Sequence, residues 1–299
     1  MRFTRSRSKK KLDHQRLYII GFVFTFLVIL SLFVLVKSYW AKKSTLSLAI
    51  PAQNGDILIA VFNSETGKIS SLEIPKDTEI LVSKNLGVWK AGSLWKLALQ
   101  EKDEHIFPRS LMKTFYFPVK FYAEEQATGF VEGGFFNIVK SLLSIYKTNM
   151  SLLDKISLAS FSLTVNNIDK LDIDAKSEFL TKTKLSDGEE GFVKKIQIPT
   201  RILVAFSDPQ ISKDGIKVKI IDATGQGVAT EVAKIVSTLG AKVTSIKLTD
   251  KEDMDCLVAS KERGLARKFA EILNCAVKIE NIDSSDVEIK IGPAFAKKF

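Results

Sequence analysis

Two kinds of hydrophobic pattern divide this chain. Residues 17–36 form one apolar run of twenty residues without a charge. As a helix rising 1.5 Å per residue, the run spans about 30 Å, the hydrocarbon thickness of a bilayer. Beyond it, short apolar runs alternate with stretches of helical periodicity, which predicts strands and helices of a globular α/β protein.

The charges that flank the apolar run predict its orientation. Seven Lys and Arg precede it and three follow within 37–43, which favours a cytoplasmic N-terminus. A cleaved signal peptide or a buried core helix is the alternative, but the run exceeds a signal h-region of about 7–15 residues. We therefore expect a basic cytoplasmic tail at 1–16 and an uncleaved transmembrane signal anchor at 17–36. The protein is then a single-pass cell-membrane protein whose bulk is extracytoplasmic.

The first part of the external region has a strand hairpin at its start. Residues 57–62 and 69–74 are apolar runs of strand length, and the turn between them contains Gly67, which tolerates positive φ. The pattern further predicts helices at 92–101, 135–146 and 151–161, and strands at 192–198 and 201–206. We assign residues 46–206 to one α/β domain.

The last part of the chain has the clearest pattern. A segment containing Pro, Asp and Gly, residues 207–215, predicts a linker before a domain at 216–292. Strands and amphipathic helices follow one another there as β-α-β-β-α-β-β, which predicts a small α/β sandwich. Gly225 and Gly227, between the first strand and helix, suggest either a phosphate loop or a tight turn. Thr230 stands where a dinucleotide fingerprint has its third glycine, which favours the tight turn.

The net charge of +10 does not indicate nucleic-acid binding. Residues 1–43 hold ten basic residues and one acid, whereas the remaining 256 residues hold 34 basic and 33 acidic ones. A balanced folded part gives no support for a basic nucleic-acid face. We therefore expect no nucleic-acid partner.

Cysteine and histidine limit the chemistry that the external part can perform. Cys256 and Cys275 either form a disulfide, which an extracytoplasmic location permits, or are two small buried hydrophobes. His105 is the single histidine of the external part, so a zinc site built from His and Cys is excluded. It lies in a charged stretch that also disfavours a Ser-His-Asp triad.

Two segments resemble the LytR–CpsA–Psr (LCP) family. Residues 55–78 resemble the opening of its catalytic domain, where an apolar strand, a turn and a second strand lead into Ile74-Pro-Lys-Asp77. Residues 216–292, with Ile221-Asp-Ala-Thr-Gly225, are similar to the accessory LytR C-terminal domain. The resemblance covers the ends of the external part well and the middle, about 85–205, poorly. It implies a degenerate LCP-like α/β/α domain followed by the small sandwich.

The resemblance also implies a chemistry. LCP proteins transfer anionic glycopolymers from undecaprenyl-pyrophosphate carriers to peptidoglycan, with arginines, aspartates and a divalent cation around the pyrophosphate. On this chain the corresponding catalytic residues are Asp56, Lys76 and Asp77, and Asp56 and Asp77 are the metal ligands. Mg²⁺ or Mn²⁺ would be required for activity, and otherwise no cofactor is expected.

This sequence departs from the family pattern at positions on which the family's chemistry depends. Ile57 replaces the usual Thr and Lys76 the usual Arg, and the external part has only four arginines. Arginine binds phosphate with a bidentate fork that lysine lacks. We therefore expect a non-catalytic envelope protein that binds peptidoglycan, wall glycopolymer, a polyprenyl-phosphate lipid or an envelope partner. The alternative is a divergent phosphotransferase in which lysines replace the arginines.

The predicted anchor can be tested directly. A reporter that is active only outside the cytoplasm, fused after residue 299, should be active, and the full-length chain should sediment with membranes. The physical reason is the uncharged run at 17–36 with its asymmetric flanks. Recovery of the full-length chain in the soluble cytoplasmic fraction would contradict the anchor.

Overall fold

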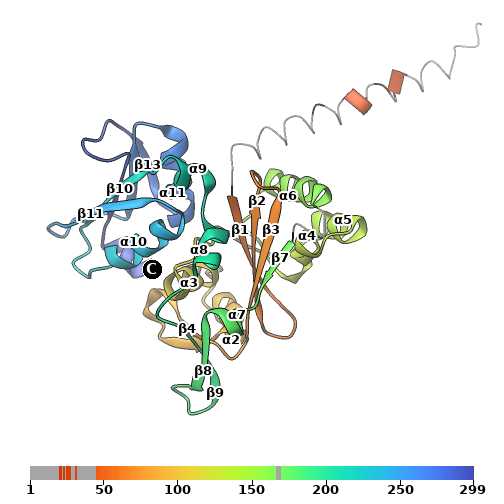
Figure 1. The fold of residues 1–299 in the computed structure, drawn as a ribbon, viewed down its shortest axis with the longest axis horizontal. Coiled ribbons are helices and arrows are strands. Elements are labelled where there is room, and N and C mark those ends of the chain that lie inside the picture. Colours follow the sequence, from red (N-terminus) through yellow and green to blue (C-terminus); the bar gives the residue numbers. More distant parts are fainter. Residues whose placement is uncertain (1–19, 22, 24, 28–30, 32–44, 166–169) are drawn as a thin grey trace, which may run out of the picture.

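A computed structural model describes residues 20–21, 23, 25–27, 31, 45–165 and 170–299. The predicted anchor at 17–36 lies largely outside these residues. Among the residues described, no helix is both long and apolar enough to cross a membrane. The α/β class predicted from the sequence is confirmed, with helices packed against two five-stranded sheets (Figure 1).

The first sheet has the strand order β6-β1-β2-β3-β7. Its strands are β1 (Thr45–Pro51), β2 (Ile57–Asn63), β3 (Lys68–Ile74), β6 (Phe121–Tyr122) and β7 (Lys170–Ile173). The predicted hairpin is β2–β3, paired antiparallel with Ile57 opposite Ile74. Its turn is held by the Asn63 carboxamide, which accepts two backbone N–H groups, and by Gly67 at a φ of 68°. β6 and β7 add in parallel to β1 and β3.

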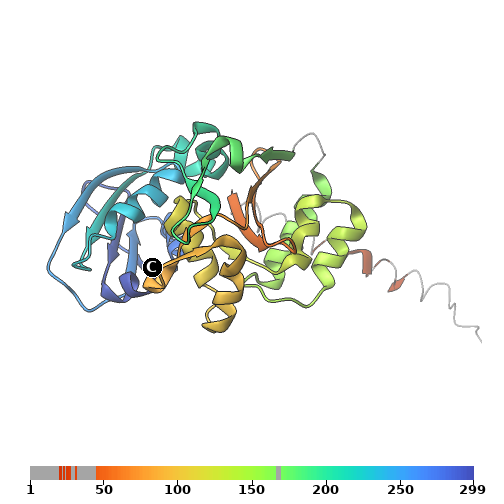
Figure 2. The same cartoon turned by 90° about the horizontal axis from the view of Figure 1, so that it is seen from below.

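Helices cover both faces of this sheet. On one face lie α2 (Ala91–Gln100) and α3 (Ile106–Phe115), and on the other α4 (Gly129–Glu132), α5 (Phe135–Leu143) and α6 (Leu152–Thr164). The strands supply both cores because successive side chains point to opposite faces. On β2, for example, Val61 packs toward α2 and α3, and Phe62 toward α6. The first unit, residues 45–194, therefore has three layers, with α4–α6 outermost (Figure 2).

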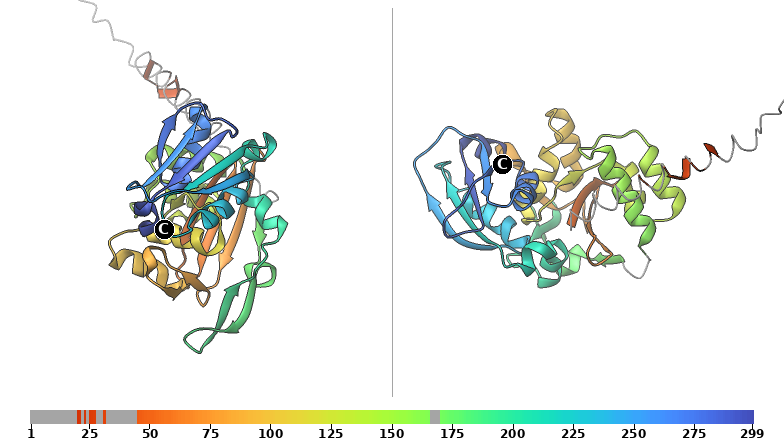
Figure 3. Two further views of the ribbon diagram at one scale, coloured as in Figure 1. Left: turned by 90° about the vertical axis from the view of Figure 1, so that its left-hand side faces the viewer. Right: turned by 90° about the horizontal axis from the view of Figure 1, so that it is seen from above.

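Smaller elements complete the first unit. They are η1 (Ser83–Asn85), η2 (Glu125–Thr128), α7 (Ala175–Glu178) and the two hairpins β4 (Glu79–Leu81) with β5 (Val88–Lys90), and β8 (Leu180–Lys184) with β9 (Glu190–Lys194). The β8–β9 hairpin projects from the body of the molecule (Figure 3).

Two helices join the units. The predicted strand at 201–206 is wrong, because these residues belong to α8 (Thr200–Phe206), where Ile202 and Phe206 lie one turn apart and are both buried. Within the predicted linker 207–215 lies α9 (Pro209–Lys213). The buried Asp208 caps α9 through two backbone N–H groups and forms an ion pair of 3.1 Å with Lys268. The connection is therefore ordered and attached to the second unit. The division into domains at 46–206 and 216–292 stays a prediction.

The second unit follows the predicted order of elements, β-α-β-β-α-β-β, and adds a helix after the last strand. The elements are β10 (Lys217–Asp222), α10 (Ala229–Thr238), β11 (Lys242–Leu248), β12 (Cys256–Ser260), α11 (Arg263–Leu273), β13 (Ala276–Ile279), β14 (Val287–Ile291) and α12 (Pro293–Lys298). The sheet order is β11-β10-β14-β12-β13, and only the β12–β14 pair is antiparallel. A disulfide joins Cys256 of β12 to Cys275, just after α11, which decides between the two readings of these cysteines.

One apolar core runs through both units. It extends from α2 and α3 to the inward face of the second sheet. At the junction Phe117 stacks on Phe206 with ring centroids 4.4 Å apart and planes 6° from parallel, and Phe115 and Phe179 pack around them. Phe117 and Phe206 are both fully buried, so separating the two units would expose aromatic surface to water.

We expect core and surface phenylalanines to differ sharply in their contribution to stability. Phe269 of α11 is fully buried, so Phe269→Ala should lower the free energy of unfolding by about 3–5 kcal/mol. Phe136→Ala, on the exposed face of α5, should change it by less than about 0.5 kcal/mol. Urea unfolding of the full chain in detergent micelles, followed by circular dichroism, measures both. Equal losses for the two variants would contradict the assigned core.

Two lysines share one aromatic ring at the junction. Lys194 of β9 and Lys234 of α10 lie with their Nζ atoms 3.9 and 4.6 Å from the centroid of the Tyr116 ring. Lys194 Nζ also donates to the Thr114 carbonyl. Burial lowers the pKa of Lys194 from 10.5 to about 8, and the positive charge of Lys234 acts in the same direction.

The lowered pKa of Lys194 predicts a pH dependence of stability. Between about pH 8 and 10.5 the unfolded chain holds a proton on this lysine that the folded chain has lost, so raising the pH favours the folded state. As the pH rises from 7 to 10, the free energy of unfolding of the unsubstituted chain should increase relative to that of Lys194→Gln. Lys182→Gln, at an exposed ion pair on β8, is the control. A difference between parent and Lys194→Gln that does not change with pH would rule out the lowered pKa.

Candidate functional site

Asp56 lies at the start of β2, and both of its carboxylate oxygens already have hydrogen-bond donors. The Lys76 backbone N–H donates to Oδ1 at 2.7 Å, and the Asn54 side-chain amide donates to Oδ2 at 2.8 Å. These bonds fasten the turn before β2 to the turn after β3. Asp56 therefore has a structural task in the loop, whatever else it does.

The Lys76-Asp77 segment is held by its backbone. The Lys76 carbonyl accepts the N–H of Gly92 at the start of α2, and the Asp77 carbonyl accepts the N–H of Phe192 in β9. The Lys76 side chain is exposed and that of Asp77 half-buried. Neither side chain hydrogen-bonds or forms an ion pair with a residue that the structure describes.

The groove that Asp56 lines is acidic. It has a volume of about 460 Å³, and its charged lining residues are Asp56, Glu73, Asp172, Asp174 and a single lysine, Lys176. Four carboxylates against one ammonium group repel a pyrophosphate unless cations compensate them. Over the described residues, no three His, Cys, Asp or Glu side chains are grouped closely enough to hold a metal ion. The roles assigned to Asp56, Lys76 and Asp77 in catalysis, and to the two aspartates in metal binding, stay predictions.

The glycine turn of the second unit is held by a carboxylate. Buried Asp222 accepts the backbone N–H and hydroxyl of Thr224, and it also accepts the Ala229 N–H at the start of α10. Gly225 and Gly227 take positive φ values of 72° and 74°. A phosphate at this helix start would meet the charge of Asp222, so the geometry is that of a tight turn.

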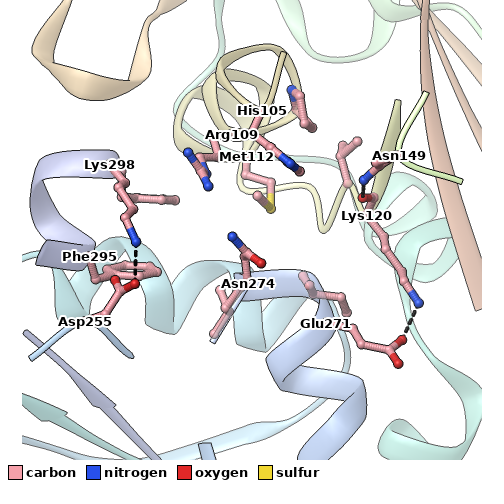
Figure 4. Close-up of a pocket in the computed structure, with 15 residues that line it drawn as sticks. His105, Arg109, Met112, Lys120, Asn149, Asp255, Glu271, Asn274, Phe295 and Lys298 are labelled. Atoms are coloured by element: carbon pink, nitrogen blue, oxygen red, sulfur yellow. Dashed lines mark hydrogen bonds and ion pairs between the residues drawn. The ribbon is translucent and has the colours of Figure 1, made fainter. Parts of the chain in front are cut away.

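A second cleft lies between the two units (Figure 4). It is formed by α3, the loop before β6, the end of α11 and α12, and its volume is about 70 Å³. His105, Arg109 and Met112 recur at helical spacing, so one face of α3 lines the cleft while its other face enters the core. Asn274, in the left-handed conformation that ends α11, supplies a side-chain amide from the opposite wall.

Arg109 has no carboxylate within hydrogen-bond distance among the residues that the structure describes, although the charges of Asp103 and Asp255 both act on it. Its side chain is 13% exposed, and its ion pair with Asp103 is 3.7 Å long, beyond hydrogen-bond distance. Asp103 is shared with Lys84, which binds it at 2.7 Å. The guanidinium group makes no hydrogen bond to any residue in the described ranges, and it remains protonated at neutral pH.

The other cations of the cleft have carboxylate partners. Lys298 pairs with Asp255 and Lys120 with Glu271. Burial lowers the pKa of His105 below its usual range, and the charge of Arg109 adds to the effect, so the imidazole is neutral at pH 7. A neutral imidazole beside a guanidinium offers hydrogen bonds without adding a second fixed charge.

The cleft can therefore bind a small anion. A volume of about 70 Å³ accommodates a few water molecules or one oxyanion, and charge-assisted bonds from arginine are strong in a half-buried site. Sequence reasoning missed this cleft because Arg109 and Asn274 come from different units. The available signal was the rarity of arginine, with Arg109 and Arg201 the only two between the anchor and the second unit.

Comparison with known proteins finds distant structural relatives only. No protein-family model matches the chain, and no curated protein matches it. Among solved structures, B. subtilis TagT is 13% identical with a TM-score of 0.38, over 50% of this chain and 84% of that one. B. subtilis TagV is 7% identical with a TM-score of 0.39, over 67% and 99%. A LytR-CPS2A-psr family protein, YwtF (TagT) with bound octaprenyl pyrophosphate lipid, is 12% identical with a TM-score of 0.36, over 50% and 83%.

These structural neighbours are LCP proteins, similar at low identity over half to two thirds of this chain. At such TM-scores we transfer neither activity nor ligand from them. The likeness of residues 216–292 to the LytR C-terminal domain also stays a prediction.

Proposed function

We propose that this chain is a membrane-anchored extracytoplasmic envelope protein that binds a phosphate-bearing wall polymer or lipid-linked precursor without transferring it. The observation that carries the proposal is Arg109, a largely buried guanidinium in the cleft between the units whose ion pair, with Asp103, is long. The anchor at 17–36 and the ligand class come from the sequence, through the apolar run and the LCP resemblance.

The environment of Arg109 supports anion binding. Both units screen the N–H donors of Arg109 from water. A hydrogen bond from them to a phosphate oxygen would therefore be stronger than the same bond at an open surface. Asn274 and His105 provide neutral hydrogen-bonding groups in the same space. The cleft is too small for a polyprenyl chain, so it would hold the charged end of such a ligand.

Two features support binding without catalysis. The carboxylate of Asp56 is engaged by Lys76 N–H and Asn54, and the groove beside it carries four carboxylates with one lysine. Phosphoryl transfer needs cations or donors placed where negative charge develops. No arginine of the described residues lines this acidic groove, whereas Arg109 lines the cleft between the two units.

The test uses the full chain in detergent micelles with farnesyl pyrophosphate as a short lipid-pyrophosphate probe. Arg109→Gln should weaken binding about ten- to a hundredfold, because a hydrogen bond to a charged group contributes about 1.5–3 kcal/mol. Arg201→Gln removes an exposed arginine, which pairs with Glu178 outside the cleft, and should leave the affinity unchanged. Equal affinity of the parent and Arg109→Gln, with unchanged unfolding midpoints, would exclude the cleft.

The same preparation tests for catalysis. With Mg²⁺ or Mn²⁺, a lipid-pyrophosphate-linked glycan and peptidoglycan as the acceptor, we expect no transfer of the glycan phosphate and no release of the carrier lipid as its monophosphate. Metal-dependent release that disappears in Asp56→Ala would establish the divergent phosphotransferase instead. Binding of the probe to Asp56→Ala shows that this variant is folded.

A further inference from the structure

The outer layer of the first unit exposes an unusual amount of apolar surface. Seven large apolar side chains between residues 135 and 163 are at least half exposed: Phe135, Phe136, Leu143, Ile145, Leu152, Leu153 and Leu163. Phe136 is 85% and Ile145 100% exposed. Within the described part of the chain, no other element covers these side chains. We call the surface formed by these seven residues the α5–α6 face.

Six of the seven exposed residues lie on two adjacent helices, and Ile145 lies in the loop between them. On α5, Phe136 and Leu143 are seven residues apart and share one side, while Ile138 and Ser141 face inward. On α6, Leu152 and Leu163 share a side, and the opposite side enters the core through Leu158 and Phe161. The two helices pack on each other, and their layer lies on the side of the molecule away from the second sheet (Figures 1 and 2).

Lysines outnumber carboxylates on this hairpin. Between Phe135 and Thr164 the charged residues are Lys140, Lys147, Lys155 and one carboxylate, Asp154. Asp154 is buried in the capping box of α6, where it bonds Ser151. Carboxylates outside the hairpin offset part of this charge, since Lys147 pairs with Glu104 at 3.0 Å and exposed Glu132 lines a pocket with Lys140. The exposed Phe, Leu and Ile side chains are therefore the stronger argument for a bilayer interface, and the lysines within the hairpin are compatible with anionic lipid.

The start of the folded part lies beside this face. Leu46 of β1 pairs with Phe62, and the ring of Phe62 meets that of Phe161 on α6 at 6.3 Å. The end of α6, with Leu163, is therefore close to the first strand. Only the eight residues 37–44 separate β1 from the predicted anchor, a reach of about 30 Å when fully extended.

We infer that the α5–α6 face lies on the outer surface of the membrane, with the apolar side chains in the headgroup region and the lysines near anionic lipid. This inference rests on the membrane anchor of the proposed function. A tether of eight residues holds the face at high local concentration over the bilayer, so a weak apolar contact suffices to orient the unit. The cleft with Arg109, which lies between the two units, is then kept at a fixed height above the lipid.

The test places a tryptophan on the face in the full chain. Ile145→Trp is compared with Leu248→Trp, at a position of β11 that is 76% exposed on the second unit. Both variants are reconstituted in vesicles of phosphatidylethanolamine and phosphatidylglycerol, with and without brominated acyl chains. Emission of the unsubstituted chain, which has three tryptophans, is subtracted.

We expect both variants to float with the vesicles, and brominated lipid to remove about half of the added emission at position 145 and none at 248. Flotation without quenching at 145 would overturn the inference and leave the face to a protein partner or a second copy. A chain that does not float would instead remove the anchor of the proposed function, and the inference with it. Unchanged circular dichroism of both variants confirms that they are folded.

Discussion

The stacking of Phe117 on Phe206 determines how the rest of the molecule is arranged. Phe117 follows α3, and Phe206 ends α8, so this contact joins the first unit to the helices that lead into the second. The apolar core then continues across the junction, which brings α3, α11 and α12 around one small cleft. The position of Arg109 relative to Asn274 follows from that packing, since neither unit alone forms the cleft.

Much of the fold follows from local pattern. The β2–β3 hairpin and the elements of the second unit are predictable because their apolar residues repeat with a single clear period between turn residues. At 201–206 the run was too short to separate strand from helix. There Pro199, which precedes the first turn of α8, was the local signal for a helix start. Strands β1, β6 and β7 escaped prediction, and β6 and β7 are short parallel additions whose pairing partners lie 70 to 100 residues away.

The candidate site was less predictable than the fold. The resemblance directed attention to Asp56, Lys76 and Asp77, where the structure has a fastened turn and an acidic groove. His105 lies in a charged stretch, yet it is half-buried beside Tyr122 and Arg109. Burial of that kind depends on which distant segments pack together. The local hydrophobic periodicity of a single sequence therefore does not reveal it.

The disulfide between Cys256 and Cys275 constrains the unfolded chain as well as the folded one. It closes a loop across a separation of 19 residues, and such a crosslink removes freedom from the unfolded chain worth about 3 kcal/mol. The strand β12 and helix α11 lie within or at the ends of this loop, so they remain near one another even before the sheet forms. The redox state of the surroundings thereby becomes a determinant of how readily the second half of the chain folds, and so of when the cleft between the units can first exist.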